Sequence, residues 1–336
     1  MDFLNAIVAL LNFVVVPATA YGAQLALGAL GATLIYGILR FSNFAHGDTM
    51  SFGTAMVILV TWWMQSHGIT LGFMPTALLA LPFGIAATAL LVLGTDRLVY
   101  RFYRKQKASP VILVIVSMGV MFIMSGITRF IIGVEEIKFA DGARFVIEAG
   151  EFKTATGLAE GLALRTTQIL TVVTAFAVMA ALFWFLNQTR TGKSMRAFSD
   201  NEDLALLSGI NPERVVAVTW IIASGLAVIA GTLYGLDKSY KTFNYFQLLL
   251  PIFAAAVVGG LGNPMGAIAG GFLVAFSEVG FTYAWKKVAT YVLPESLAPD
   301  GLMQLMSTDY KFAVSFAILI VVLLFRPTGI FKGKSV

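Results

Sequence analysis

Cysteine is absent from the chain, and histidine occurs only twice. Without cysteine there can be no disulfides, thiolate metal sites or cysteine nucleophiles, and two histidines leave little room for a metal cluster. Charged residues are also scarce, at 12% of the 336 residues against about 25% in ordinary soluble domains. These shortages weigh against most enzyme classes and exclude a water-soluble globule.

Apolar sequence is what the chain has in abundance: 58% of its residues are hydrophobic. A membrane-spanning helix needs about 20 such residues in a row. We therefore predict an all-α, polytopic integral membrane protein, a single transmembrane domain over residues 1–336, with about eight to ten transmembrane helices. The last stretch and the glycine-ended seventh are short enough to be tilted or re-entrant. The nine candidate stretches are 18–39, 49–65, 74–98, 110–133, 167–188, 213–236, 245–260, 264–285 and 312–325.

The first sixteen residues are apolar but short, and they contain Asp2, Asn5 and Asn12. As a helix they would measure roughly 24 Å, so we do not expect a full crossing of their own. Ala18-Thr19-Ala20 has the form of a signal-peptide cleavage site, but no basic segment precedes it and apolar helices follow. We expect the segment to be retained.

Basic residues indicate the orientation, because lysine and arginine near helix ends stay in the cytoplasm. Alternating the nine stretches puts three basic groups and Arg40 on one side, and it puts loop 134–166 and the stretch 286–311 on the other. The net charge of +5 thus reflects membrane topology, and nucleic-acid binding is not expected. The three groups are Arg97, Arg101, Arg104, Lys105 and Lys107; Arg190, Lys193, Arg196 and Arg214; and Arg326, Lys332 and Lys334.

The outer loop 134–166 is long for a simple connection. Its segment 143–148 alternates apolar and polar residues, which predicts a short strand. We expect a small folded cap over the outer mouth that serves as a docking surface; a mere connector is the alternative.

The cytoplasmic loop 189–212 contains signals for a short helix. Ser199 and Glu202 have the spacing of a capping box, which predicts a helix of about nine residues from Asp200. Gly209 suits the left-handed residue that ends a helix, and Asn211-Pro212 suits the start of the next one. Leucines exposed between two membrane spans indicate a partner surface, although the helix could instead pack on its own bundle.

Three motifs together carry a family resemblance. Residues 203–209, DLALLSG, are similar to the E-A-A-x-x-x-G loop of ATP-binding-cassette importer permeases, with Asp for Glu and Leu for the first Ala. Residues 43–48 read NFAHGD, and residues 259–266 read GGLGNPMG. From Tyr21 onward the chain resembles the branched-chain amino-acid ABC transporter permeases, specifically the shorter permease with the N-F-A-H-G signature.

The resemblance implies a set of partners. These are a homologous second permease forming a heterodimer, two cytoplasmic ATPase subunits that bind ATP and Mg, and a periplasmic binding protein delivering a branched-chain or other neutral amino acid or a related amide. This chain would bind no cofactor and catalyse no reaction. Which solute crosses stays open: leucine, other neutral amino acids, amides, urea and short carboxylates all remain.

The chain has no nucleotide site of its own. Gly192-Lys193-Ser194 matches the end of a phosphate-binding loop, but Asn187 stands where its first glycine belongs and closes an apolar helix. Gly260-x-Gly262 with Gly266 lacks the spacing of a dinucleotide fingerprint and instead predicts a tight turn. Energy must come from a separate ATPase or, as the alternative, from an ion gradient through a secondary transporter or channel.

Candidate site residues fall into two groups. Acids that orient the cytoplasmic helix, leucines that fill a groove on the ATPase and a glycine that ends the helix form the coupling group: Glu202, Asp203, Leu204, Ala205, Leu207 and Gly209. Polar residues in or beside the apolar stretches could line the path or gate it: Gln24, Thr33, Asn43, His46, Asp48, Ser117, Ser125, Ser224 and Glu278.

Three of these path candidates leave alternatives open. Glu278 is expected either to face a cavity or pair, with Arg129 as a conceivable partner, or to be solvated near the outer interface. His46 and Asp48, expected at the cytoplasmic turn after Arg40, could form a proton relay or pin the start of the next helix.

Overall fold

The computed structural model describes residues 2–139, 141, 144–293, 301 and 303–331. Each predicted apolar stretch lies largely in a long helix, and among the described residues eight helical segments are long and apolar enough to cross a membrane. The 21-residue α3 is long enough but more polar. The prediction of an all-α polytopic protein is confirmed. The long helices are α2 (Val16–Leu39), α3 (His46–Ser66), α4 (Ala77–Thr95), α6 (Pro110–Ile132), α8 (Thr166–Gln188), α11 (Pro212–Asp237), α12 (Thr242–Gly259), α13 (Pro264–Thr282) and α15 (Lys311–Phe325).

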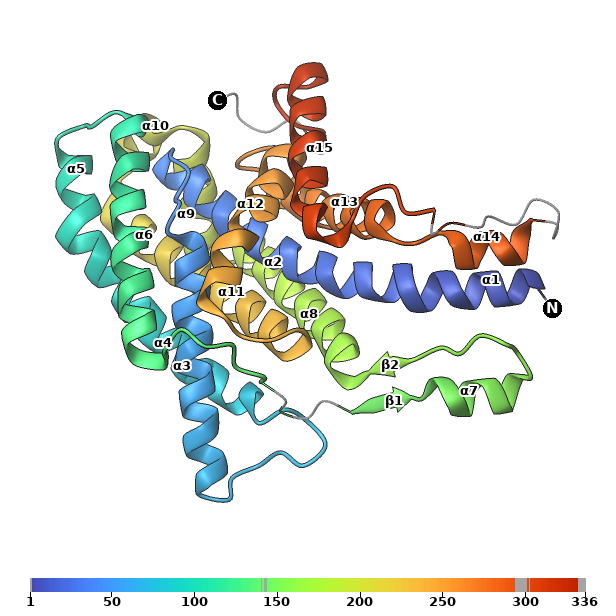
Figure 1. Cartoon of the computed structure of the whole chain (residues 1–336). Helices are drawn as coiled ribbons and strands as arrows, with labels where there is room; N and C mark the ends of the chain where they lie inside the picture. The colour runs from blue at the N-terminus through green and yellow to red at the C-terminus, as the bar shows by residue number, and fades with distance from the viewer. Residues whose placement is uncertain (1, 140, 142–143, 294–300, 302, 332–336) are drawn as a thin grey trace.

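Short elements gather at the two ends of the bundle (Figure 1). One end holds α5 (Arg101–Lys105), α9 (Arg190–Asp200) and α10 (Glu202–Leu207), together with the basic residues around them. By the positive-inside rule it is the cytoplasmic end. The other end holds α1 (Asp2–Leu10), α7 (Ala149–Thr156), α14 (Lys286–Val292) and the strands β1 (Phe145–Ile147) and β2 (Leu164–Arg165), and we call it the outer end. Lys332 and Lys334 lie outside the described residues.

The N-terminal segment is an extension of the first crossing. Helix α1, the π-helical turn η1 (Leu11–Val15) and α2 run on as one helix of 38 residues, Asp2–Leu39. At 1.5 Å per residue it measures about 57 Å, whereas the hydrocarbon core is about 30 Å thick. Its second half is buried in the bundle, and its first half projects at the outer end (Figure 1). The segment therefore makes no separate crossing, as predicted.

The outer loop 134–166 is folded. Strand β1 pairs antiparallel with β2, which confirms the predicted strand over Phe145–Ile147; Ala143 lies outside the described residues. Side chains of α1 fasten the loop: Asn5 Oδ1 accepts N–H bonds from Ala159 and Glu160 at 3.0 and 3.2 Å. Asparagines in the predicted non-crossing segment thus hold the cap together.

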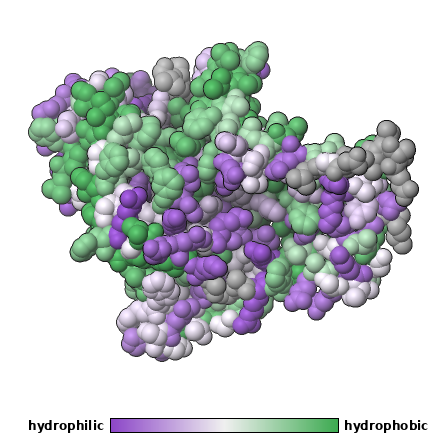
Figure 2. Space-filling view, viewed as in Figure 1, coloured by the Kyte–Doolittle hydropathy of each residue, from purple (hydrophilic) through white to green (hydrophobic). Residues whose placement is uncertain are grey.

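Small residues let the central helices touch. A Cβ on Gly266 of α13 would lie 2.2 Å from the carbonyl oxygen of Gly259 in α12, and one on Gly271 would lie 2.6 Å from the backbone nitrogen of Ala26 in α2. In lipid, burial of apolar surface contributes little to helix association, so close backbone contact of this kind stabilises the bundle. Figure 2 shows apolar side chains mainly over the left and top of the visible face, with a band of hydrophilic side chains across its middle.

Candidate functional site

The segment joining α2 to α3 folds back into the membrane. Helix α2 ends at Leu39, and Arg40 turns the chain with a left-handed φ of 58°. Helix α3 then begins at His46, whose Nε2 lies 3.0 Å from the carbonyl oxygen of Gly28. Gly28 precedes Leu39 by eleven residues, so His46 lies about 16 Å along α2 from its cytoplasmic end. The expectation that His46 and Asp48 occupy a cytoplasmic turn is wrong, because the NFAHGD segment reaches about mid-membrane depth.

Non-helical backbone at this depth needs hydrogen-bond partners from the protein. The N–H of Phe44 donates to Ser117 Oγ of α6 at 3.1 Å, and the N–H of Ala45 donates to Asn43 Oδ1 at 3.2 Å. Asn43 Oδ1 also accepts from the hydroxyl of Tyr100 at 3.2 Å. Asn43 and Ser117, predicted as path residues, hold this re-entrant backbone in place.

His46 and Gly47 fix the start of α3 against two neighbours. The His46 ring packs so closely on α2 that a Cβ on Gly31 would lie 2.8 Å from its Cε1. A Cβ on Gly47 would lie 2.7 Å from the carbonyl oxygen of Tyr245 in α12. Of the two alternatives, the geometry favours pinning, although His46 pins a helix inside the membrane.

Asp48 lies in the first turn of α3 and is 2% exposed. It lines a cavity of about 290 Å³ with Ser125 and Arg129 of α6. The suggested pairing of Arg129 with Glu278 is therefore wrong. Sequence alone could not choose the partner because the choice depends on which helices are neighbours.

Glu278 is buried between helices at 1% exposure, which excludes one of its two predicted alternatives, solvation near the outer interface, and favours the other, a buried carboxyl group with a partner. Its carboxylate accepts a hydrogen bond from Ser315 of α15. Gln24 lies on α2 and donates through Nε2 to the carbonyl oxygen of Leu233 at 3.4 Å. These contacts lie between helices of the central bundle.

The remaining path candidates are scattered. Thr33 lines a separate cavity of about 230 Å³ next to α8 and α9. Ser224 donates to the carbonyl oxygen of Ile221 within α11. The predicted path residues therefore do not all converge on one site. Asn43, His46, Asp48 and Ser117 lie at the re-entrant segment, and Ser125 shares the cavity of Asp48. The others, Gln24, Thr33, Ser224 and Glu278, lie elsewhere.

The cytoplasmic loop has two helices where one was predicted. Helix α9 runs through Ser199 to Asp200, and α10 has six residues with Asn201 as its N-cap, whose Oδ1 accepts from the N–H of Leu204 at 3.0 Å. The predicted capping box and the nine-residue helix from Asp200 are wrong. Met195 and Phe198 are apolar residues three positions apart, and both are buried on one face of α9. This spacing is the sequence signal that could have revealed the helix.

Helix α10 presents apolar side chains to the outside. Leu204, Leu206 and Leu207 are exposed, Leu207 at 85%, while Ala205 is buried at 3% and faces the bundle. Gly209 follows with a φ of +79°, and its N–H donates to the carbonyl oxygen of Leu206 at 3.0 Å. Glu202 and Asp203 lie exposed in the first turn of α10. Gly209 ends the helix, and Asn211 and Pro212 begin α11, as predicted.

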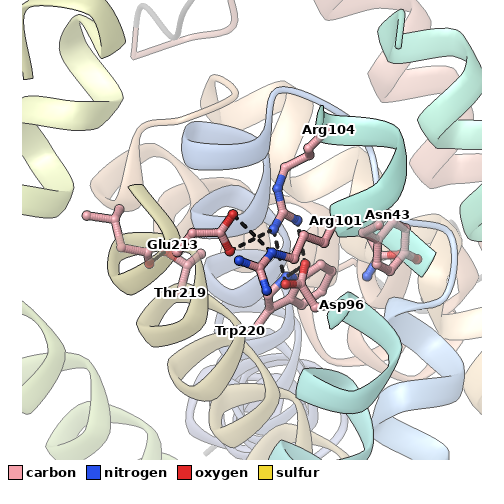
Figure 3. Close-up of polar contacts among 9 residues, drawn as sticks. Asn43, Asp96, Arg101, Arg104, Glu213, Thr219 and Trp220 are labelled. Carbon is pink, nitrogen blue, oxygen red and sulfur yellow. Dashed lines mark hydrogen bonds and ion pairs between the residues drawn. The ribbon is translucent and has the colours of Figure 1, made fainter. Parts of the chain in front are cut away.

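A polar cluster joins the start of α11, directly after this loop, to residues 96–105, which continue α4 as one helix (Figure 3). Glu213, in the first turn of α11, lies 3.3 Å from Arg101 Nε and 3.8 Å from Arg104 Nη2. Arg104 also pairs with Asp96, which accepts a hydrogen bond of 2.8 Å from Trp220 Nε1. From the sequence these arginines were assigned to topology alone. Asp96 is only eight residues from Arg104, but Glu213 and Trp220, which complete the cluster, are more than 100 residues away, so the sequence did not reveal it.

The cluster reaches the re-entrant segment through aromatic side chains. Tyr100 stacks on Trp220 with ring centroids 5.3 Å apart, and its hydroxyl bonds Asn43. A second connection runs from α9: Arg40 Nη2 donates to the carbonyl oxygen of Ser199 at 2.5 Å, and Ser199 Oγ donates to the carbonyl oxygen of Gly37 at 3.1 Å. The cytoplasmic loop is thus bonded on both flanks to the segment that enters the membrane.

Comparison with known proteins gives consistent matches along the whole chain. Residues 15–323 match the family model described as the branched-chain amino acid transport system permease component. The high-affinity branched-chain amino acid transport system permease protein LivH of Escherichia coli K12 is 30% identical, over 94% of this chain and 93% of LivH. BraD of Pseudomonas aeruginosa is 28% identical over 94% of both chains.

A more distant match covers only part of the chain. The galactose/methyl galactoside import permease protein MglC of Haemophilus influenzae is 29% identical over 50% of this chain and 51% of MglC. No solved structure matches the chain.

Proposed function

Because this chain belongs to the branched-chain amino acid transport permease family, we propose that it is the membrane subunit of an ATP-driven importer for branched-chain or other neutral amino acids. The chain is a transport permease in a bacterial inner membrane, with no catalytic role of its own. The observation that carries the proposal is α10: a short helix exposing three leucines at the cytoplasmic end, bonded through its flanks to a mid-membrane segment.

In this proposal α10 is the contact with an ATPase subunit. Leu204, Leu206 and Leu207 fill an apolar groove on the partner, and Glu202 and Asp203 orient the helix start, where negative charge is favourable. Ala205 anchors α10 to the bundle. ATP and Mg bind to the two ATPase subunits, and this chain binds no cofactor.

Motion of α10 then has two routes into the membrane. One runs through the contacts of Ser199 with Arg40 and Gly37, and the other through the cluster from Glu213 to Tyr100. Both end on the segment 40–46, so ATP-driven movement of the loop shifts the re-entrant segment and opens the bundle alternately to the two sides.

The remaining partners occupy other faces. A homologous second permease completes the pathway as a heterodimer, and a periplasmic binding protein docks on the cap formed by α1, α7, α14 and the two strands. Asn12 Oδ1 accepts from the N–H of Ala163 at 2.9 Å and keeps that surface preformed.

A gradient-driven transporter is the second candidate, because Glu278 is a carboxyl group buried among helices. Reconstitution distinguishes the two. The full set of subunits in liposomes should accumulate leucine only with ATP, and vanadate should abolish uptake while a protonophore should not. This chain alone should accumulate nothing. Leucine accumulation by the isolated chain, driven by an ion gradient, would overturn the proposal.

A further inference from the structure

The residues that line the cavity beside Asp48 have no role in the proposed coupling mechanism. The cavity lies between the starts of α3 and α12 and the second half of α6. It opens to the surface: Asp48 and Met121 are buried, Ser125 is half-buried, and Arg129, Phe122 and Phe246 are exposed. Asp48, Ser125 and Arg129 form its polar wall, and Met121, Phe122 and Phe246 belong to its apolar wall. It therefore combines one acid, one base, one hydroxyl and an apolar surface.

The two charges are separated within this cavity. Asp48 is almost completely buried, yet no direct ion pair within 4.0 Å joins it to Arg129. An arginine is costly on a surface that faces hydrocarbon, so the α6 face holding Arg129 must border protein or a water-filled path. Arg129 follows Pro110 by nineteen residues, about 28 Å along α6, whereas Asp48 lies near mid-depth. The cavity thus extends from the membrane centre toward the outer end.

These features match the groups of one ligand class. A zwitterionic amino acid has a carboxylate, for which the arginine fork supplies paired N–H donors, and an ammonium group, which a buried carboxylate and a hydroxyl accept. An aliphatic side chain would lie on the methionine and phenylalanine wall. A volume near 300 Å³ is at the small end of ligand pockets, as suits a single amino acid.

We propose that this cavity is a transit site for a zwitterionic amino acid, with Arg129 receiving the carboxylate, Asp48 and Ser125 the ammonium group, and Met121, Phe122 and Phe246 the aliphatic side chain. The inference rests on the proposed function and narrows it: neutral amides and urea would leave both protein charges unpaired, and short carboxylates would leave Asp48 unpaired. Residues of α3, α6 and α12 select the ligand, and the cytoplasmic loop drives its movement.

The absence of cysteine from the chain allows a direct test. In the complete transporter in membrane vesicles, Ser125→Cys introduces a thiol into the cavity wall by a nearly isosteric change. We expect 20 mM leucine to slow its labelling by a methanethiosulfonate reagent at least about fivefold, read as the mass shift of this chain. Ser66→Cys, on the exposed end of α3, is the matched control and should be labelled equally with and without leucine.

Analogues test the charge assignment in the same assay. 4-Methylpentanamide, which lacks both charges, and 4-methylpentanoate, which lacks the ammonium group, should protect Ser125→Cys less than twofold. Equal protection by leucine and the amide would overturn the zwitterion assignment, and no protection by leucine would overturn the site.

Transport separates this inference from the proposed function. Asp48→Asn and Arg129→Gln should each lower ATP-dependent leucine uptake at least about tenfold, whereas Asp309→Asn and Arg326→Gln, exposed charges away from the cavity, should leave it unchanged. Wild-type uptake that depends on ATP, together with normal uptake by both cavity variants, would refute the site and leave the proposed function standing. A wild type without ATP-dependent uptake would refute the proposed function itself.

Discussion

Arg40 Nη2 donates a hydrogen bond of 2.5 Å to the backbone carbonyl of Ser199, which joins the end of α2 to the last turn of α9. The two residues are 159 positions apart, and each lies beside a different functional segment. Arg40 precedes the re-entrant NFAHGD segment, and Ser199 precedes α10. The bond therefore lies where movement of the cytoplasmic loop would first reach the membrane.

Arg40→Ala should uncouple the transporter. A hydrogen bond from a charged donor contributes about 1.5–3 kcal/mol, which corresponds to roughly a tenfold or larger change in an equilibrium. We expect leucine uptake to fall at least about tenfold while vanadate-sensitive ATP hydrolysis continues, both measured on the same proteoliposomes. Arg40→Lys, which retains a cationic donor, should recover part of the uptake; parallel loss of uptake and hydrolysis would contradict a coupling role.

Gly209→Val should disturb the end of α10. Gly209 has a φ of +79°, a conformation that costs non-glycine residues about 1–2 kcal/mol and β-branched residues more. ATP hydrolysis should become independent of uptake, with membrane insertion unchanged by immunoblot. Gly209→Asn is the control, because asparagine tolerates this conformation, and it should behave close to wild type. Normal uptake by the valine variant would remove Gly209 from the coupling group.

Asp96→Asn should destabilise the fold. The Asp96 carboxylate is buried and pairs with Arg104, and breaking one side of such a pair costs about 3–5 kcal/mol. We expect a lower midpoint of thermal unfolding in detergent. The double variant with Arg104→Gln should lose less stability than the two single variants added together, since it leaves no uncompensated charge. Additive losses would show that the two side chains are not energetically coupled.

The outer cap should loosen in acid. Burial alone would raise the pKa of Glu160, but its ion pair with Lys287 at 2.7 Å and the hydrogen bond from Tyr291 at 2.8 Å outweigh burial and lower this pKa below its ordinary 4.5. The contribution to stability is therefore fully present above pH 4.5 and is lost as the pH falls through the lower, folded-state pKa.

Limited proteolysis of the cap at a series of pH values, with an acid-stable protease, would measure this effect. Cleavage should increase as the pH falls below 4.5 in the wild type, whereas Glu160→Gln should be cleaved at a rate that varies little with pH. The hydrogen bond from Tyr291 to Glu160 raises the pKa of the Tyr291 phenol to about 12, so the phenol stays protonated through the neutral range. An identical pH profile in the variant would show that Glu160 does not hold the cap.

The membrane helices were predictable because each must supply about 20 apolar residues from its own sequence. The strand Phe145–Ile147 and the helix end at Gly209 were predictable for similar reasons, since alternation and a left-handed glycine are local signals. The start of α10 was not. Ser199 and Glu202 match a capping box, but burial of Phe198 extends α9 past Ser199, so tertiary packing overrides the local pattern.

The sequence could not show how deep the segment 43–48 lies in the membrane or which residues contact it. Nothing local to Asn43 shows that the chain returns along α2, because that path depends on Ser117 and Tyr100 from two other helices. Likewise Glu278 was predicted to be a buried carboxyl group with Arg129 as a conceivable partner, but α6 packs against α3, so Asp48 and not Glu278 shares a cavity with Arg129.

The unbroken helix Asp2–Leu39 has a mechanical consequence for the whole transporter. This helix contacts the cap through Asn5 and the cytoplasmic loop through Gly37, so a tilt of the whole helix would move both of its ends. A partner bound to the cap and a partner bound to the cytoplasmic loop would therefore act on the same helix. The π-helical turn at Leu11–Val15 interrupts the regular helix and is the point at which we expect it to bend.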